Sequence, residues 1–177
     1  ILVEKPAGLN LNQILKIKKV SNEKKASVYI AYNRRFYQSV IKAKQLILSD
    51  GGLKSFHFEF TEFGHKIEKF STLDDIKKHW LICNSTHVID LAFFFGGIPE
   101  SFNVYQSDYL IWHPSGAIFT GSGITKLDTL FSYYANWNSP GRWGIELNTN
   151  NLRLKLQPLE KLFVQNRDSF DWEEIIL

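Results

Sequence analysis

The stretch that decides the fold covers residues 86–97 and reads THVIDLAFFFGG. Its apolar residues recur at the i, i+3, i+4, i+7 spacing of a helix with one buried face. The members of that face are Val88, Leu91, Ala92 and Phe95. Asn84 or Ser85 can cap the start of this helix, and the closing glycine pair can end it. We therefore predict a helix that packs one side against a core.

The same helix carries two polar side chains on a second face. His87 and Asp90 are three residues apart, so both project from one side of the helix. An imidazole and a carboxylate placed in this way can line a cleft. The alternative is a partly buried histidine satisfied by local hydrogen bonds, and the stretch taken alone favours that alternative. The rest of the chain has to decide between them.

Composition excludes several classes of function. The chain has 177 residues, 44% of them hydrophobic and 22% charged, which is typical of a globular protein. A net charge of +3 indicates neither a nucleic-acid partner nor an anionic membrane. The single cysteine, Cys83, excludes an internal disulfide framework and favours a reducing, cytoplasmic location. His65, His79 and His113 are dispersed, so we predict no metal site.

The pattern before and after residue 36 differs. Residues 1–33 read strand–helix–strand, with an apolar run at 27–32 that suits a parallel strand covered on both faces. A helix follows, and then Phe56, Phe58 and Phe60 alternate with polar residues as in a half-buried strand. Six further strands are predicted, at residues 102–110, 117–120, 127–136, 143–149, 152–156 and 161–164.

These elements predict an α+β fold with a large, mainly antiparallel sheet and helices on one face, preceded by a β–α–β unit. We place the domain boundary after residue 36, which gives domains 1–36 and 37–177. The chain starts at Ile1 and contains no methionine. We therefore expect it to be a piece of a longer protein, or a sequence from which modified methionines are left out.

Three short motifs, in order, resemble the Gfo/Idh/MocA oxidoreductases, the glucose–fructose oxidoreductase and inositol dehydrogenase family. Residues 1–6, ILVEKP, resemble the E-K-P motif of that family. Residues 32–36, YNRRF, are similar to its Y-N-x-R-F motif. Residues 85–97 resemble its catalytic helix, which has the pattern H-x-x-D and a glycine ending. The resemblance extends from Ile1 to about Val164.

The resemblance implies the second half of a two-domain enzyme. In the family, a Rossmann domain holds NAD or NADP through a glycine-rich turn, and an α+β domain offers its sheet to a substrate that is commonly a sugar. The E-K-P motif lies late in the Rossmann domain, and no G-x-G-x-x-G follows a strand here. We therefore expect the substrate domain of an NAD(P)-dependent oxidoreductase, and no binding of NAD or NADP by this chain alone.

The resemblance also implies roles for individual residues. His87 is the candidate base for a substrate hydroxyl, and Lys5 places a cation beside that hydroxyl. Asp90 and Arg35 are candidate substrate-binding residues, although Asp90 can equally be a solvated carboxylate and Arg35 an interdomain ion-pair residue. The candidate cofactor-binding residues are Glu4, Lys5, Pro6 and Asn33.

One departure from the family leaves a second function open. The family usually has an aspartate four residues before the histidine, and Cys83 stands there. Without that carboxylate, the orientation and basicity of His87 are in question. The alternative function is therefore a catalytically inactive, family-like module for binding or assembly, and an unrelated α+β binding domain is a third possibility.

Two expectations concern arrangement in space. Lys5 and His87 have to lie within roughly 4–10 Å of each other, with open space between them, if both touch one hydroxyl. Large apolar side chains occur across the predicted strands, which indicates a second apolar sheet face and a homodimer or homotetramer. The side chains concerned are Trp112, Phe119, Phe131, Tyr133 and Trp143.

Overall fold

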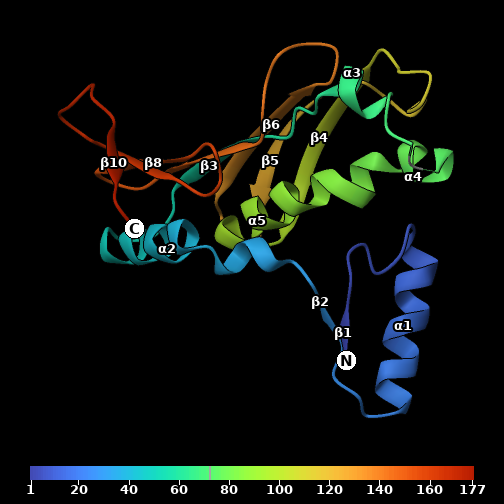
Figure 1. Cartoon of the computed structure of the whole chain (residues 1–177). Helices are drawn as coiled ribbons and strands as arrows, with labels where there is room; N and C mark the ends of the chain where they lie inside the picture. Colours follow the sequence, from blue (N-terminus) through green and yellow to red (C-terminus); the bar gives the residue numbers. More distant parts are fainter. Residues whose placement is uncertain (72) are drawn as a thin grey trace.

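The N-terminal segment forms the predicted strand–helix–strand unit in a computed structural model, which describes residues 1–71 and 73–177 (Figure 1). Strands β1 (Leu2–Val3) and β2 (Tyr29–Ile30) pair in parallel, and helix α1 (Leu11–Glu23) connects them. Asn10 caps α1, because its side chain accepts a hydrogen bond from the Gln13 amide at 3.1 Å.

The prediction that this unit is covered on both faces is wrong for the chain as it stands. The Leu2 and Tyr29 side chains are 75% and 65% exposed. Two short strands and one helix can cover only one side of a two-stranded sheet. The unit therefore presents unburied apolar surface that isolated parallel strands do not normally carry.

The sheet domain follows after a short connection. The 3-10 helix η1 (Asn33–Phe36) leads into α2 (Gln38–Ser49), whose Val40, Ala43 and Ile47 are buried. Two short helices, α3 (Gly64–Ile67) and α4 (Asp74–Lys78), precede the π-helical turn η2 (Leu81–Ser85) and helix α5 (Thr86–Gly96).

Eight strands make one sheet in the order β10-β9-β8-β7-β3-β6-β5-β4. Their bounds are β3 (Ser55–Glu59), β4 (Pro99–Ser107), β5 (Ile118–Thr125), β6 (Leu130–Asn136), β7 (Gly144–Asn148), β8 (Leu152–Leu156), β9 (Leu162–Asn166) and β10 (Glu173–Ile175). All neighbours are antiparallel except β3 and β6, so the predicted fold class is confirmed. Strand β10 was not predicted.

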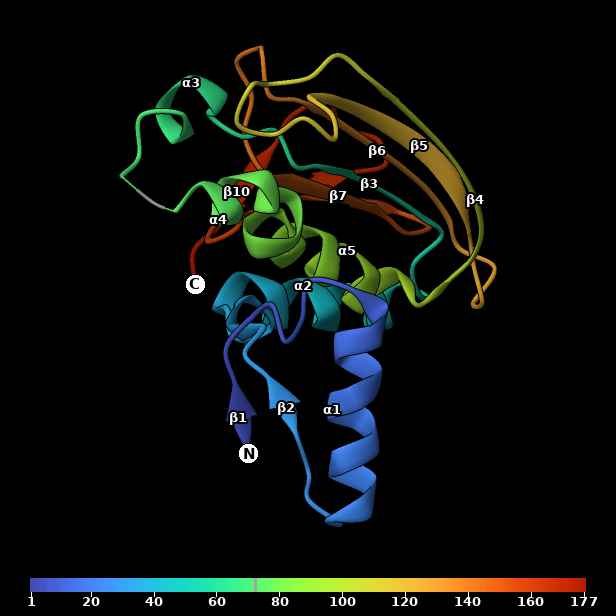
Figure 2. The same ribbon diagram turned by 90° about the vertical axis from the view of Figure 1, so that its right-hand side faces the viewer.

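Helices α2 and α5 cover one face of this sheet (Figure 2). The alternation predicted from the sequence holds, because Phe56, Phe58 and Phe60 all point into the core beneath these helices. Among the described helices, none has both the length and the apolar character needed to cross a bilayer.

The reason given above for a second apolar sheet face is wrong. Phe131 pairs with Phe56 and Tyr133 pairs with Phe58, so these aromatic side chains share the helix-covered face. The five side chains concerned all belong to this one core or pack against it: Trp112, Phe119, Phe131, Tyr133 and Trp143. Self-association of the chain stays a prediction without that support.

Helix α5 has the predicted range and core face, but its start differs from the prediction. Val88, Leu91 and Ala92 are fully buried. Ser85 has a helical backbone (φ −66, ψ −17) and makes no capping hydrogen bond, because η2 runs directly into α5. Gly97 ends the helix with a φ of +87, a conformation that favours glycine.

A substitution at Gly96 tests how tightly α5 packs on the sheet. A Cβ atom at this position would collide with the Phe56 ring. We expect Gly96→Ala to lower the free energy of unfolding by about 1–3 kcal/mol, although alanine usually favours a helix. Urea denaturation measures the change, and the penalty should shrink in a Phe56→Leu background. A neutral or stabilising Gly96→Ala variant would contradict this packing.

Candidate functional site

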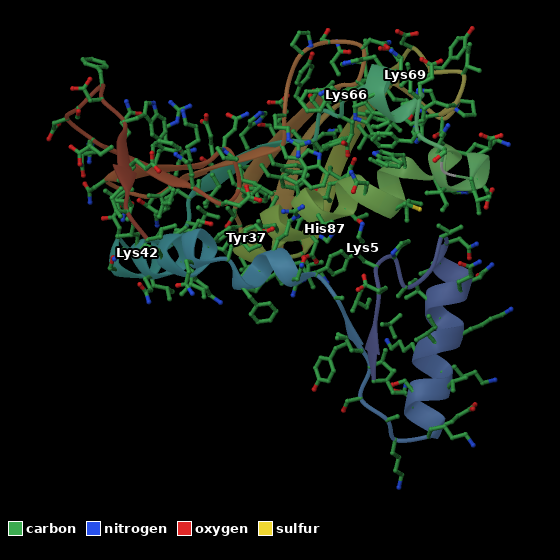
Figure 3. All side chains as sticks on the ribbon, in the orientation of Figure 1. Lys5, Tyr37, Lys42, Lys66, Lys69 and His87 are labelled. Carbon is green, nitrogen blue, oxygen red and sulfur yellow. The ribbon has the colours of Figure 1, made fainter. Side chains whose placement is uncertain are left out.

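The candidate site lies where the β1–α1–β2 unit meets the start of α5. Lys5 follows β1, and His87 is the second residue of α5 (Figure 3). The Lys5 ammonium donates a hydrogen bond to the Cys83 carbonyl at 2.5 Å, across a separation of 78 residues. Its positive charge also acts on His87. The structure therefore brings the two predicted catalytic residues close together, although Lys5 lies in the first of the three motifs and His87 in the third.

The environment of His87 keeps its ring neutral. Burial, followed by the positive charges of Lys5 and Arg34, lowers the pKa of His87 to about 4. The Tyr32 ring lies edge-on with its centroid 6.2 Å away, and the Trp143 centroid lies at 6.3 Å. The buried Nδ1 atom has no hydrogen-bond partner within the described structure. A histidine satisfied by local hydrogen bonds does not match these surroundings.

The π-helical turn η2 supplies backbone acceptors to the site. Lys5 occupies the Cys83 carbonyl, and the Thr86 hydroxyl donates to the Ile82 carbonyl at 2.8 Å. Single π-turns inside helices are frequent at functional sites. Burial raises the pKa of the Cys83 thiol, so this side chain stays protonated. Position 83 therefore contributes its backbone oxygen, for which the identity of the side chain matters little.

A buried carboxylate that the sequence analysis missed, Glu62, is hydrogen-bonded to side chains of η2. Glu62 is only 3% exposed and accepts hydrogen bonds from the Ser85 hydroxyl at 2.7 Å and the Asn84 amide at 3.0 Å. Burial raises the pKa of Glu62, and these two hydrogen bonds oppose the shift. The only available signal was an acidic residue directly after an alternating strand.

The two predicted substrate-binding residues bind each other. The Arg35 guanidinium makes a bidentate ion pair with the Asp90 carboxylate, in which Nε donates to Oδ2 at 2.8 Å and Nη2 donates to Oδ1. Arg35 also lies 4.9 Å from the centroid of the Phe94 ring. This pair joins η1 to α5. That it links two domains stays a prediction. Direct contact of either residue with a substrate stays a prediction.

The remaining predicted site residues belong to the segments on either side of Lys5 and Arg35. Glu4 and Asn33 are exposed, and Pro6 is half-buried beside Lys5. Their position at the carboxyl ends of parallel strands β1 and β2 is where open α/β sheets bind ligands. Cofactor contact by these residues stays a prediction. Within the described part of the chain, no group of three or more His, Cys, Asp or Glu side chains is placed to hold a metal ion.

Arg34 belongs to the site but was not singled out in the sequence. Its guanidinium donates to the Tyr37 hydroxyl at 2.6 Å and lies 5.1 Å from the centroid of the Trp143 ring. Adjacent residues of a 3-10 helix point about 120° apart, so Arg34 and its neighbour Arg35 reach different partners. The motif drew attention to the second arginine, and only the tertiary structure shows that the first lies by His87.

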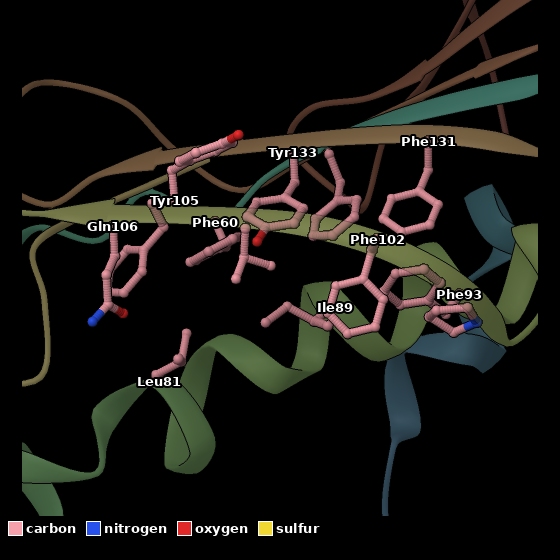
Figure 4. A pocket seen from close by; sticks show the side chains of 13 residues that line it. Phe60, Leu81, Ile89, Phe93, Phe102, Tyr105, Gln106, Phe131 and Tyr133 are labelled. Atoms are coloured by element: carbon pink, nitrogen blue, oxygen red, sulfur yellow. The ribbon is translucent and has the colours of Figure 1, made fainter. Parts of the chain in front are cut away.

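A separate, apolar cavity of about 350 Å³ lies on the opposite side of α5. Ile89 and Phe93 of α5 face Phe102 of the edge strand β4 across this cavity (Figure 4). Its walls are mainly aromatic, with Phe131 and Tyr133 on the sheet side. Helix α5 therefore separates an apolar hollow from the polar side chains around His87.

Comparison with known proteins gives a match by structure only. No family model matches the sequence, and no curated protein matches it. Levoglucosan dehydrogenase in complex with NADH and levoglucosan is similar, with a TM-score of 0.79, 17% identity, and coverage of 100% of this chain and 54% of that chain.

Two further structures show the same fold. UDP-N-acetylglucosamine 3-dehydrogenase from Acidithiobacillus ferrooxidans has a TM-score of 0.75 at 16% identity, covering 99% of this chain and 55% of its own. An oxidoreductase from Agrobacterium radiobacter, in complex with NAD+, L-tartaric acid and magnesium, has a TM-score of 0.74 at 12% identity, covering 98% and 53%. These structures are Gfo/Idh/MocA-type oxidoreductases, so the fold implied by the motifs is confirmed. The chain spans about half of their length.

The electrostatic account of His87 can be tested by NMR titration of its ring protons. We expect a midpoint near the pKa of about 4, and a higher midpoint in Lys5→Gln because one repelling charge is removed. Lys69→Gln, at an exposed site distant from His87 in Figure 3, is the matched control and should leave the midpoint unchanged.

The lowered pKa of His87 also predicts how the free energy of unfolding changes with pH. Because unfolded histidine binds its proton near pH 6.5 and folded His87 binds it only near pH 4, the free energy of unfolding should fall as pH drops through that window. The decline should be smaller in Lys5→Gln. An unshifted midpoint in wild-type protein would contradict the burial of His87 beside two cations.

Proposed function

We propose that the chain is the substrate domain of a Gfo/Idh/MocA oxidoreductase that transfers hydride between a nicotinamide cofactor and a hydroxyl-bearing carbon of a sugar or sugar derivative. The observation that carries this proposal is the meeting of Lys5 and His87. Local sequence does not require a lysine at the end of β1 to bond the turn before α5. A reaction at one hydroxyl, which needs a proton acceptor and a cation together, gives that meeting a function.

His87 accepts the proton of the substrate hydroxyl. Its ring is neutral at physiological pH, so it is in the protonation state that an acceptor needs. The Lys5 ammonium, held by the Cys83 carbonyl, has further N–H groups with which to stabilise negative charge on the substrate oxygen. The nicotinamide, when bound, supplies the hydride acceptor. Burial lowers the pKa of Lys5. The ammonium can therefore give up or take back a proton more readily as the charge on this oxygen changes.

The ion pair between Arg35 and Asp90 positions the catalytic residues. It fixes η1 against the first two turns of α5, and so sets the angle at which His87 faces the β1–α1–β2 unit. Glu62 steadies the turn that carries the Cys83 carbonyl. Asp90 is also open to a hydrogen bond from a sugar hydroxyl, since a carboxylate can accept more than two bonds.

Cofactor binding requires more than this chain offers. Glu4, Pro6 and Asn33 lie where they can border the nicotinamide end of NAD or NADP. The printed sequence contains no glycine-rich turn to hold the pyrophosphate. The chain therefore supplies the nicotinamide side of the site and depends on a Rossmann region for the rest. We place the whole enzyme in the cytoplasm, as a homodimer or homotetramer through the outer sheet face.

A catalytically inactive binding or assembly module is the second candidate. The cysteine at position 83, where the family has an aspartate, is the observation that favours it. Glu62 weakens this argument, because it brings a carboxylate to the same turn from a different element. Activity measurements separate the two candidates.

The test is the reduction of NAD+ and NADP+ by the complete gene product with a panel of sugars. We expect activity with at least one sugar, and a loss of roughly 10²–10⁴-fold in kcat for His87→Ala. Lys5→Ala should lose roughly 10²–10³-fold, and Lys69→Ala should match wild type. If no sugar is oxidised although sugars bind, the inactive module is the better account. Activity that survives both substitutions would contradict the assigned roles.

A further inference from the structure

The charges that act on the His87 ring are both positive. Lys5 and Arg34 both act on the ring, and no ion pair to Lys5 exists within the described structure, where its bond goes to a neutral carbonyl. Four carboxylates lie near these cations: Asp90 is paired with Arg35, Glu62 is buried against two side chains of η2, Glu4 acts on Lys5, and Glu160 pairs with Arg34. At the His87 ring itself, however, the charges that shift the pKa are the two positive ones.

Arg34 is the less explained of the two cations. Its Nη1 atom donates to the Tyr37 hydroxyl, and its guanidinium carbon lies over the Trp143 ring, so the side chain is held in place. Its Nε atom is buried and has no hydrogen-bond partner in the described structure. A buried donor left without a partner costs free energy, so the side chain gains if an acceptor is supplied to the guanidinium.

The ion pair that Arg34 does make is too weak to account for its placement. Glu160 lies 3.4 Å from Nη1, and its side chain is 59% exposed. Exposed pairs of this kind contribute little to stability and are screened by salt. Glu160 leaves Nε unpartnered and leaves the positive field at His87 in place.

We propose that Arg34, together with Lys5, binds an anionic group on the substrate, so that the preferred substrate is an acidic sugar. The inference rests on the proposed function and narrows its substrate class. Arginine suits the role because its planar guanidinium, fixed on an aromatic ring, presents several donors to a carboxylate or phosphate. Arg34 and His87 both lie against the Trp143 ring. An anionic group bound at Arg34 and a hydroxyl bound at His87 can therefore belong to one small molecule.

An anion at this position also improves His87 as a base. With the two cations uncompensated, the pKa of about 4 makes the ring a weak proton acceptor. A negative charge beside Lys5 and Arg34 offsets their repulsion of the imidazolium and raises the pKa of His87 toward neutrality. Acidic substrates are therefore favoured in both binding and proton transfer, whereas neutral sugars leave the base weak.

The test compares acidic and neutral forms of the same sugars by calorimetry on the complete gene product, without oxidised cofactor. The probe pairs are D-glucuronate with D-glucose and D-galacturonate with D-galactose, and D-glucose 6-phosphate distinguishes a phosphate from a carboxylate site. We expect the acid of at least one pair to bind roughly 10-fold to 100-fold more tightly. Arg34→Gln should remove this preference, so that the acid and its neutral partner bind about equally, and Arg34→Lys should keep part of it.

Arg167→Gln, at an exposed arginine on the distal turn after β9, is the matched control and should keep the full preference. The inference is overturned if acids bind no better than neutral sugars, or if the preference survives Arg34→Gln. If Arg34→Gln fails to fold, Arg34→Lys replaces it in the test. The inference is then overturned if Arg34→Lys prefers the acid as strongly as wild type does and if this preference does not change with salt concentration. Efficient oxidation of neutral sugars would then leave the proposed function standing without the inference.

Discussion

The burial of one face of α5 is the constraint on which the rest of the structure depends. Val88, Leu91 and Ala92 are fully enclosed by the sheet, so the helix cannot rotate about its axis. A second face of the helix, with His87 and Asp90, is thereby fixed toward the β1–α1–β2 unit. Two polar contacts complete the joint, the bidentate pair of Asp90 with Arg35 and the bond from Lys5 to the Cys83 carbonyl. Packing against the sheet sets the orientation of α5, and the two polar contacts fix the position of the β1–α1–β2 unit against it.

This joint creates an unusual electrostatic environment. It places a half-buried imidazole among aromatic rings and holds two cations beside it, while Asp90 and Glu62 are bonded to other partners. Cations kept close together cost free energy, since each lowers the stability of the other's charge. Strongly shifted pKa values of this kind cluster at functional sites. The apolar cavity across α5 shows none of these features.

The sequence predicted those parts that depend on local periodicity. The helix at residues 86–96, the alternating strand around Phe58 and the parallel β–α–β unit follow from patterns of three or four residues and of two. The expectation that Lys5 lies near His87 came only from the order of three motifs, and the bond from Lys5 to the turn before His87 was not predicted. Periodicity could not show that η2 replaces a helix cap, because that depends on Glu62 reaching the turn from another element. It could not separate Arg34 from Arg35, which neighbour each other in sequence but contact different residues. The outer sheet face was misjudged because large side chains were assigned without the strand register.

The most direct test of this account is a crystal structure of the complete gene product with a nicotinamide cofactor and a bound sugar substrate or product. The account predicts one oxygen of the sugar within about 2.6–3.2 Å of both the Lys5 ammonium and a ring nitrogen of His87. It also predicts that the bidentate pair between Arg35 and Asp90 remains intact beside the sugar. A sugar bound away from His87, in the apolar cavity beneath β4 or elsewhere, would contradict the assignment of this joint as the active site.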